Sequence, residues 1–244
     1  MTTPIIFSDF DGTIAQVDVT DVILNEFADP KWREVEEEWV AGRVGSRECL
    51  RRQMALVRAS AEDLDALVDS VPLDPGFVAF QRWTREHRIP FCVVSDGFDY
   101  VIRRILQRCG FDGELLNGSH LFASSMRIEK DTVRVQFPHP PAPCLHGCAT
   151  CKPEVMRRLA DGHSSVIFIG DGLSDRFAVE AADVVFAKDK LLAYGRDRNL
   201  SVSPFSTFAD IQHNLQPLVG AEAAASVRRR RRQRGRALVE VGQD

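Results

Sequence analysis

Two aspartates, Asp9 and Asp11, lie two residues apart directly after the apolar run 5–8. In an extended strand, residues i and i+2 share a face, so both carboxylates point into one crevice. Two carboxylates held this close repel each other unless a proton or a cation intervenes. A hard divalent cation with oxygen ligands, most simply Mg²⁺, relieves the repulsion. The pair therefore predicts a magnesium site, although the pattern taken alone also fits a strand that ends in a solvated acidic turn.

Further polar residues follow along the chain in an order that suits a phosphate site. Ser95 closes a second apolar run, Lys152 begins a helix, and Asp171 and Asp175 follow a third apolar run. Each residue taken alone has an ordinary explanation as a surface lysine or a turn residue. Together, an acid pair, a hydroxyl, a lysine and a second acid pair predict a phosphate-binding site that contains a metal.

The elements that position these residues are short buried strands separated by helices. Segments with helical spacing at 76–87 and 100–108 lie between the apolar runs, which is typical of a parallel α/β sheet. In such sheets ligands bind at the carboxyl ends of the strands, where the polar residues are found here. The runs that we expect to form strands are 5–8, 91–95, 166–170 and 184–187.

The predicted Rossmann-like core comprises residues 1–16 and 75–215, and two segments interrupt it. Residues 17–74 form consecutive helical patterns punctuated by proline and glycine, so we expect a helical cap. Residues 112–151 combine short alternating stretches with a proline-rich run, which predicts a small β and loop insertion. Residues 216–244 form an Arg-rich C-terminal tail.

The four polar motifs identify a family resemblance. The ordered set DFDGT at 9–13, Ser95, Lys152 and GDGLSD at 170–175 resembles the motifs of haloacid dehalogenase (HAD) superfamily phosphatases. The helical insertion is similar to the cap of subclass IB, which contains phosphoserine phosphatase. The stretch from CLHGCATCKP to FAKDKLL looks most like the MtnX-type phosphatases of methionine salvage. The resemblance implies the HAD fold and Mg²⁺-dependent hydrolysis of a small phosphorylated metabolite, for MtnX-type enzymes a hydroxyketo methylthiopentenyl phosphate.

The same resemblance implies the catalytic roles. Asp9 would attack phosphorus and form an aspartyl phosphate. Asp11 would protonate the leaving alcohol and then deprotonate the attacking water, so it must carry a proton when substrate arrives. Its acidic neighbour raises its pKa while Mg²⁺ and Lys152 lower it, and the sequence leaves the balance open. An acid at this position favours a phosphatase over a dehalogenase, while transfer to a second acceptor stays open.

The binding roles follow in the same way. Asp9, the backbone carbonyl of Asp11 and Asp171 would hold Mg²⁺, with Asp175 as a further ligand or a supporting acid. The residues that would bind the phosphoryl oxygens are Thr13, Ser95 and Lys152.

The sequence predicts the reaction more clearly than it predicts the substrate. Asp18 takes the place of the glutamate that phosphoserine phosphatases use to recognise the substrate amino group, but it also suits the N-cap of a helix beginning near Val19. Asp96 departs from the Ser-Gly-Gly that usually follows in the second motif. Phosphoserine and other small metabolites stay open as substrates, as does a regulatory protein that binds phosphate without turnover.

Cys144, His146, Cys148 and Cys151 form a cluster with C-x-H-x-C-x₂-C spacing just before Lys152. Two interpretations fit this spacing. The cluster is either a structural Zn²⁺ site that fixes the loop before Lys152, or a set of reduced cysteines packed there.

Composition restricts the partners. The 244 residues are 44% hydrophobic and 27% charged, as in globular proteins, and no apolar run is long enough to span a membrane. Residues 228–244 hold seven arginines against two acids, a net +5, so the rest of the chain carries −9 of the total −4. An acidic body and a tail without aromatic residues do not favour a nucleic-acid partner. The absence of a signal-peptide pattern predicts a cytoplasmic protein with reduced cysteines.

Overall fold

The computed structural model describes residues 3–111, 113–139 and 144–217. Within them, seven strands form one sheet in the order β4-β3-β2-β1-β5-β6-β7. Neighbouring strands are parallel except for the antiparallel pair β3 and β4. The α/β class predicted from the apolar runs is therefore confirmed. The strands are β1 (Ile5–Ser8), β2 (Phe91–Phe98), β3 (Leu121–Glu129), β4 (Thr132–Gln136), β5 (Val166–Gly170), β6 (Val184–Ala187) and β7 (Ser203–Pro204).

The central strands are apolar throughout because both faces of the sheet are covered. Every residue of β1 is buried, and its side chains alternate between two separate clusters. Ile6 belongs to the larger cluster on one face, whereas Ile5 and Phe7 belong to the smaller cluster on the other.

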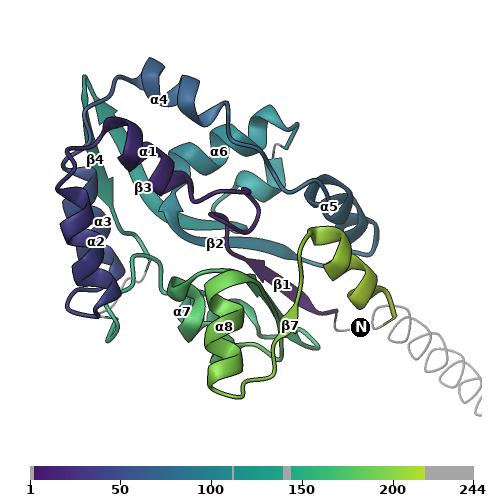
Figure 1. Cartoon of the computed structure of the whole chain (residues 1–244). Helices are drawn as coiled ribbons and strands as arrows, with labels where there is room; N and C mark the ends of the chain where they lie inside the picture. The colour runs from purple at the N-terminus through teal and green to yellow at the C-terminus, as the bar shows by residue number, and fades with distance from the viewer. Residues whose placement is uncertain (1–2, 112, 140–143, 218–244) are drawn as a thin grey trace, which may run out of the picture.

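Helices cover the two faces of the sheet (Figure 1). The larger cluster lies under α5 (Phe77–Glu86), α6 (Asp99–Arg108) and a helix at 208–217. The smaller cluster lies under α7 (Lys152–Leu159) and α8 (Asp189–Asp197).

The strand order places a ligand site at one edge of the sheet. β1 pairs with β2 on one side and with β5 on the other. The chain builds the sheet outward from β1 through β2, β3 and β4, and then returns to the other side of β1 for β5, β6 and β7. Where connections leave in opposite directions, the carboxyl ends of adjacent parallel strands open a crevice. The crevice at β1 and β5 therefore receives the motif residues of both strands.

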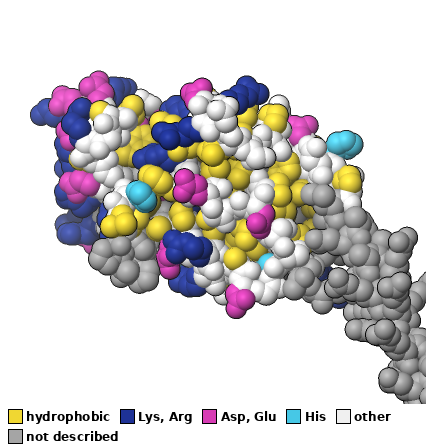
Figure 2. Space-filling view, turned by 90° about the horizontal axis from the view of Figure 1, so that it is seen from below, with side chains coloured by type: hydrophobic (Ala, Val, Ile, Leu, Met, Phe, Trp, Pro, Cys, Tyr) yellow, Lys and Arg dark blue, Asp and Glu magenta, His cyan; other side chains and the backbone are white. Residues whose placement is uncertain are grey.

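Four helices lie between β1 and α5, inside the predicted cap segment: α1 (Val19–Phe27), α2 (Trp32–Val40), α3 (Ser46–Met54) and α4 (Ala61–Val68). A bridge between Ala15 and Leu73 joins the entry to this segment with its exit. A second bridge joins Arg58 to Thr132 of β4, so the helices also contact the β3–β4 hairpin. Figure 2 shows acidic and basic side chains crowded at the end where α2 and α3 lie, consistent with an ion pair between Arg52 and Glu38.

The segment 112–151 contributes directly to the core sheet. Its strand β3 pairs with β2, and β4 extends the sheet by one more strand. The described remainder includes the 3₁₀ helix at Gly113–Leu116 and a loop that carries the cysteines. Among the described residues, no helix combines the length and the apolar character needed to cross a bilayer. From residue 218 onward, the predicted Arg-rich tail lies outside the described residues.

Candidate active site

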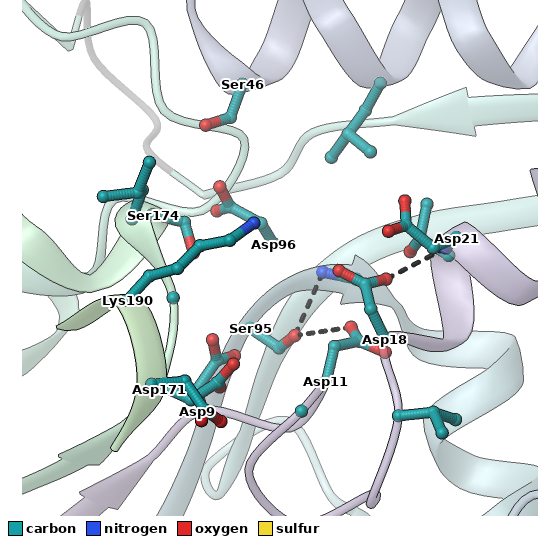
Figure 3. Close-up of a pocket in the computed structure, with 18 of the residues that line it drawn as sticks. Asp9, Asp11, Asp18, Asp21, Ser46, Ser95, Asp96, Asp171, Ser174 and Lys190 are labelled. Atoms are coloured by element: carbon teal, nitrogen blue, oxygen red, sulfur yellow. Dashed lines mark hydrogen bonds between the residues drawn. The ribbon is translucent and has the colours of Figure 1, made fainter. Parts of the chain in front are cut away.

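A cleft of about 440 Å³ opens between the carboxyl ends of the central strands and the helices α1 to α3 (Figure 3). Its core side carries motif residues from three strand ends, namely Asp9, Asp11, Ser95 and Asp171. The sheet thus brings together residues that are up to 162 positions apart in the sequence.

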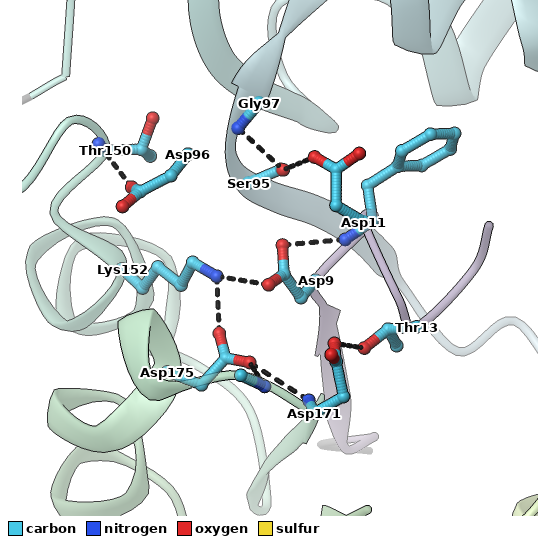
Figure 4. A network of polar contacts seen from close by, with 12 residues as sticks. Asp9, Asp11, Thr13, Ser95, Asp96, Gly97, Thr150, Lys152, Asp171 and Asp175 are labelled. Carbon is cyan, nitrogen blue, oxygen red and sulfur yellow. Dashed lines mark hydrogen bonds and ion pairs between the residues drawn. The ribbon is translucent and has the colours of Figure 1, made fainter. Parts of the chain in front are cut away.

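Lys152 joins the first and last motifs in a buried polar network around Asp9 (Figure 4). Its Nζ lies 2.7 Å from Asp9 Oδ2 and also forms an ion pair with Asp175 Oδ1. All three residues are 5% exposed or less. Burial lowers the pKa of Lys152, but the carboxylates of Asp175 and Asp9 outweigh this effect and raise the pKa above its ordinary value. Lys152 is therefore a fixed positive charge beside Asp9.

Asp175 has both carboxylate oxygens engaged by its neighbours. Oδ1 is paired with Lys152, and Oδ2 accepts hydrogen bonds of 3.0 Å from the backbone N–H groups of Asp171 and Gly172. Burial and the charge of Asp9 act to raise the pKa of Asp175, whereas its ion pair with Lys152 opposes them. Asp175 thus braces the loop after β5 and orients Lys152 at the same time.

Asp171 and Thr13 contact each other. The Thr13 hydroxyl donates a hydrogen bond of 2.5 Å to Asp171 Oδ1, so in this structure the hydroxyl is directed at the carboxylate. Burial and the charge of Asp9 raise the pKa of Asp171 to about 6. Gly12 has a φ of 67°, and a Cβ at this position would overlap Asp171 Oδ2. A glycine is therefore required here both by the backbone conformation and by the space.

The acidic residues form a donor set that fits a hard divalent cation. Carboxylate oxygens of Asp9, Asp171 and Asp175 lie within 4.8 Å of one another. All three donors are oxygens, as Mg²⁺ prefers, and a cation would relieve the repulsion that raises the pKa of Asp171. The side chain of Asp11 is not part of this group, and its backbone carbonyl stays a predicted ligand.

The Asp11 side chain turns away from the acid group toward Ser95. Its Oδ1 accepts a hydrogen bond of 3.0 Å from the backbone N–H of Val19, the first residue of α1. Its Oδ2 lies 3.4 Å from the Ser95 hydroxyl, which in turn accepts from the backbone N–H of Gly97. A Cβ at Gly97 would overlap Asp11 Oδ2, so a glycine leaves the room that this carboxyl group occupies.

Burial raises the pKa of Asp11 well above its ordinary value, and the charges of Asp18 and Asp9 add to the effect. The hydrogen bond from Val19 acts in the opposite direction but is the smaller cause. The sequence left this balance open, and without a metal it favours the protonated form that a general acid needs.

Asp18 is the N-cap of α1, as the capping interpretation predicted, and its Oδ1 accepts from the backbone N–H of Asp21. It also borders the cleft. Asp18 is exposed, but desolvation by the surrounding protein together with the charge of Asp21 raises its pKa to about 7.

The sequence pointed less clearly to other residues of the cleft. Asp96, noted only as a departure from a motif, accepts a hydrogen bond of 2.7 Å from the backbone N–H of Thr150 and so ties β2 to the cysteine-bearing loop. Lys188 and Lys190 also line the cleft. A signal for them was available, because they follow the carboxyl end of β6 as Asp171 follows that of β5.

The structure brings together only part of the predicted zinc set. The Sγ atoms of Cys144, Cys148 and Cys151 lie within 4.8 Å of one another. The His146 ring instead stacks on Phe177, with ring centroids 3.9 Å apart. The predicted fourth ligand is thus engaged elsewhere.

The family model of the haloacid dehalogenase-like hydrolases matches residues 6–180. The chain belongs to this family. This haloacid dehalogenase-like hydrolase is 32% identical over 217 residues to a 2-hydroxy-3-keto-5-methylthiopentenyl-1-phosphate phosphatase of Geobacillus thermodenitrificans, covering 88% of this chain and 96% of the relative. It is 30% identical over 220 residues to a protein of the same name from Bacillus cereus, covering 89% and 98%. The hydrolase is accordingly a phosphatase.

Solved structures support the fold of this haloacid dehalogenase-like hydrolase. A substrate-bound phosphoserine phosphatase matches with a TM-score of 0.66 at 17% identity, covering 88% of this chain and 98% of the other. A phospho-aspartyl intermediate analogue of phosphoserine phosphatase matches with a TM-score of 0.65, also at 17% identity, covering 88% and 99%. At this identity the likeness concerns the fold alone.

Proposed function

We propose that this phosphatase hydrolyses a small-molecule phosphomonoester with Mg²⁺, with Asp9 as the nucleophile and Asp11 as the general acid and base. The observation that carries the proposal is the contrast between two neighbouring carboxyl groups. Asp9 is paired with the positive charge of Lys152, whereas Asp11 is held in surroundings that favour its protonated form. A charged nucleophile beside a protonated acid is what two-step phosphate transfer needs.

The first step transfers the phosphoryl group to the protein. A carboxylate oxygen of Asp9 forms a bond to phosphorus while the bond from phosphorus to the ester oxygen breaks. Asp11 donates its proton to that leaving oxygen, so the product departs as a neutral alcohol. In the second step Asp11 takes a proton from a water molecule, whose oxygen attacks phosphorus. Inorganic phosphate leaves, Asp9 is restored, and Asp11 is again protonated.

The surrounding residues hold the reactants in place. Lys152 and the Ser95 hydroxyl would bind the phosphoryl oxygens, and Thr13 would act by holding Asp171. Asp9, Asp171 and the backbone carbonyl of Asp11 would hold Mg²⁺, which when bound neutralises charge on the transferring group. Because both oxygens of Asp175 are engaged, we assign it the task of orienting Lys152 and the loop after β5.

The favoured substrate is the one named for the curated relatives, 2-hydroxy-3-keto-5-methylthiopentenyl-1-phosphate. The cap side of the cleft supports it, because Val17, Trp39 and Leu50 give this wall an apolar portion that suits a thioether chain. Phosphoserine is the second candidate, because Asp21 and Glu36 also line the cleft and would attract an amino group.

The proposal is tested by phosphate release from a panel of phosphomonoesters that includes both candidates, with Mg²⁺ or with chelator. We expect Mg²⁺-dependent release that Asp9→Asn abolishes. Asp161→Asn serves as the control, since Asp161 is exposed in a turn beyond α7 and should leave turnover unchanged. Activity retained in Asp9→Asn contradicts the nucleophile assignment. No release from any panel member favours a protein that binds phosphate without turnover.

A further inference from the structure

Three thiols meet in the loop that leads to the phosphate-binding lysine. The Sγ atoms of Cys144, Cys148 and Cys151 lie within 4.8 Å of one another, and none of the three cysteines forms a disulfide. Cys148 is buried, while the other two are half-buried. Cys151 is the N-cap residue of α7, and Lys152 follows it directly.

A tight turn lies between the first two thiols. The backbone N–H of Gly147 donates a hydrogen bond of 3.1 Å to the Cys144 carbonyl, so the chain reverses between Cys144 and Cys148. A positive φ of 62° at Gly147 makes this turn possible.

The sulfur positions suit zinc. Zn–S bonds of about 2.3 Å place tetrahedral sulfur ligands roughly 3.8 Å apart, which the three thiols reach with small side-chain movements. Soft thiolates select zinc over the hard magnesium ion that fits the carboxylates nearby. Among the described residues, no histidine, further cysteine or carboxylate joins the group as a fourth ligand.

We propose that Cys144, Cys148 and Cys151 bind one Zn²⁺ ion, with solvent as the fourth ligand and without His146. The site is structural and lies outside the phosphate chemistry.

The place of the loop explains what such an ion would do. The loop contacts the cap segment, because the backbone N–H of Arg47 donates a hydrogen bond of 3.0 Å to the Gly147 carbonyl. It contacts the core through the hydrogen bond from Thr150 to Asp96. It then ends at Lys152, which contacts Asp9. A zinc ion would therefore fix in one geometry the segment that connects α3, β2 and the lysine.

A disulfide is the competing use of three close thiols. A disulfide would join two of the cysteines and leave the third unpaired. The two states differ in mass and in metal content, so they can be separated by direct measurement.

The first experiment is elemental analysis and native mass spectrometry of the full chain, purified under reducing conditions and reconstituted with Zn²⁺. We expect about one zinc ion per chain, released when a mercurial reagent blocks the thiols. Cys148→Ser should lower the zinc content by about tenfold or more. His146→Ala and Cys109→Ser should leave it unchanged, because neither residue belongs to the cluster.

A second measurement uses the wild-type chain, so it tests the proposal even if Cys148→Ser does not fold. Titration of the metal-free wild-type chain with Co²⁺ should give a thiolate-to-cobalt charge-transfer band that saturates at about one equivalent. The carboxylate site cannot produce this band, because it has no sulfur ligand. Absence of both zinc and the cobalt band, or a chain two hydrogens lighter because of a disulfide, overturns the proposal. Loss of zinc in His146→Ala overturns the ligand set.

Discussion

The carboxyl group of Asp11 lies between the backbone N–H of Val19 and the hydroxyl of Ser95, away from the acid group that would hold the metal. Burial raises its pKa, so at the residue scale we propose this side chain as the proton donor of the site. The donor matters most when the leaving oxygen is a poor leaving group, because an alkoxide is far less stable than a phenolate with electron-withdrawing substituents.

Replacing Asp11 with Asn should therefore affect substrates unequally. We expect kcat/KM to fall by about 10²–10⁴-fold for an alkyl phosphate, the usual contribution of a general acid. For p-nitrophenyl phosphate the formation of aspartyl phosphate should be nearly unchanged, because that leaving group needs no proton. Single-turnover measurements of alcohol and nitrophenolate release make the comparison within one variant. An equal loss for both substrates would contradict the role of Asp11 as the acid.

The roles of Asp171 and Asp175 can be separated by comparing their Asn variants. Asp171→Asn should raise the Mg²⁺ concentration for half-maximal activity about tenfold more than Asp175→Asn does, since we assign Asp171 as a direct ligand and Asp175 as its support. Asp175→Asn should instead lower the free energy of unfolding by roughly 3 kcal/mol, because it breaks a buried ion pair with Lys152. Magnesium titrations of activity test the expected difference in Mg²⁺ dependence. Urea unfolding in Mg²⁺ tests the expected loss of stability. The reverse pattern would make Asp175 the ligand.

At the scale of elements, the cap segment and the core meet where α3 faces the cysteine-bearing loop. Gly45 precedes α3, and a Cβ at this position would lie 2.5 Å from the carbonyl oxygen of Gly147. The neighbouring atoms are backbone, so they cannot move aside as a flexible side chain would. Close approach of two glycines thus lets α3 reach the loop that ends at Lys152.

Gly45→Ala should force α3 away from this loop. We expect an overpacking cost of about 1–3 kcal/mol, which for a chain of this size lowers the melting temperature by several degrees. Because Ser46 at the start of α3 lines the cleft, KM should rise as well. Gly118→Ala is the matched control, since nothing lies within 4 Å of a Cβ there. Equal behaviour of the two variants would show that the glycine contact does not set the position of α3.

At the scale of the whole molecule, the cleft concentrates negative charge. Desolvation and mutual repulsion raise the pKa of Asp18 to about 7 and of Asp171 to about 6, and raise the pKa of Asp11 as well. At a pH between the pKa of such a group in the unfolded state and its pKa in the folded state, the folded state binds more protons than the unfolded state. The stabilisation from these protons is complete below the unfolded pKa and is lost as the pH rises through the folded pKa.

The metal-free protein should therefore become less stable as the pH rises from about 5.5 to 7.5. Carboxylates with lowered pKa values, such as Glu38 and Asp69, stay ionised throughout this range and do not mask the effect. Mg²⁺ should restore stability mostly at the upper end, because it binds the deprotonated carboxylates. Thermal unfolding in chelator and in Mg²⁺ at several pH values tests this. A melting temperature in chelator that rises over the range would contradict the expected sign.

The α/β class and the order of the four motifs could be predicted from local sequence patterns. Apolar runs such as 5–8 and 166–170 are local patterns. A strand that is buried on both faces can be recognised from such a run without knowing which strands lie beside it. The arrangement of Asp9 and Asp11 was only partly predictable, because β1 ends at Ser8 and both residues lie beyond it, with the Asp11 side chain turned toward Ser95. Capping of α1 by Asp18 was predictable, since a cap acts within three residues.

How the residues share their contacts depends on the folded chain and could not be predicted from the sequence. Each carboxylate has few lone pairs, and which neighbour engages them depends on segments that meet only in the folded chain. The contacts of Asp175 with Lys152 and of Thr13 with Asp171 are such cases. The sequence likewise grouped His146 with the cysteines, but the ring stacks on Phe177, which lies 31 residues further along the chain. Spacing indicates which residue types are near one another, whereas the direction of each side chain is set by packing.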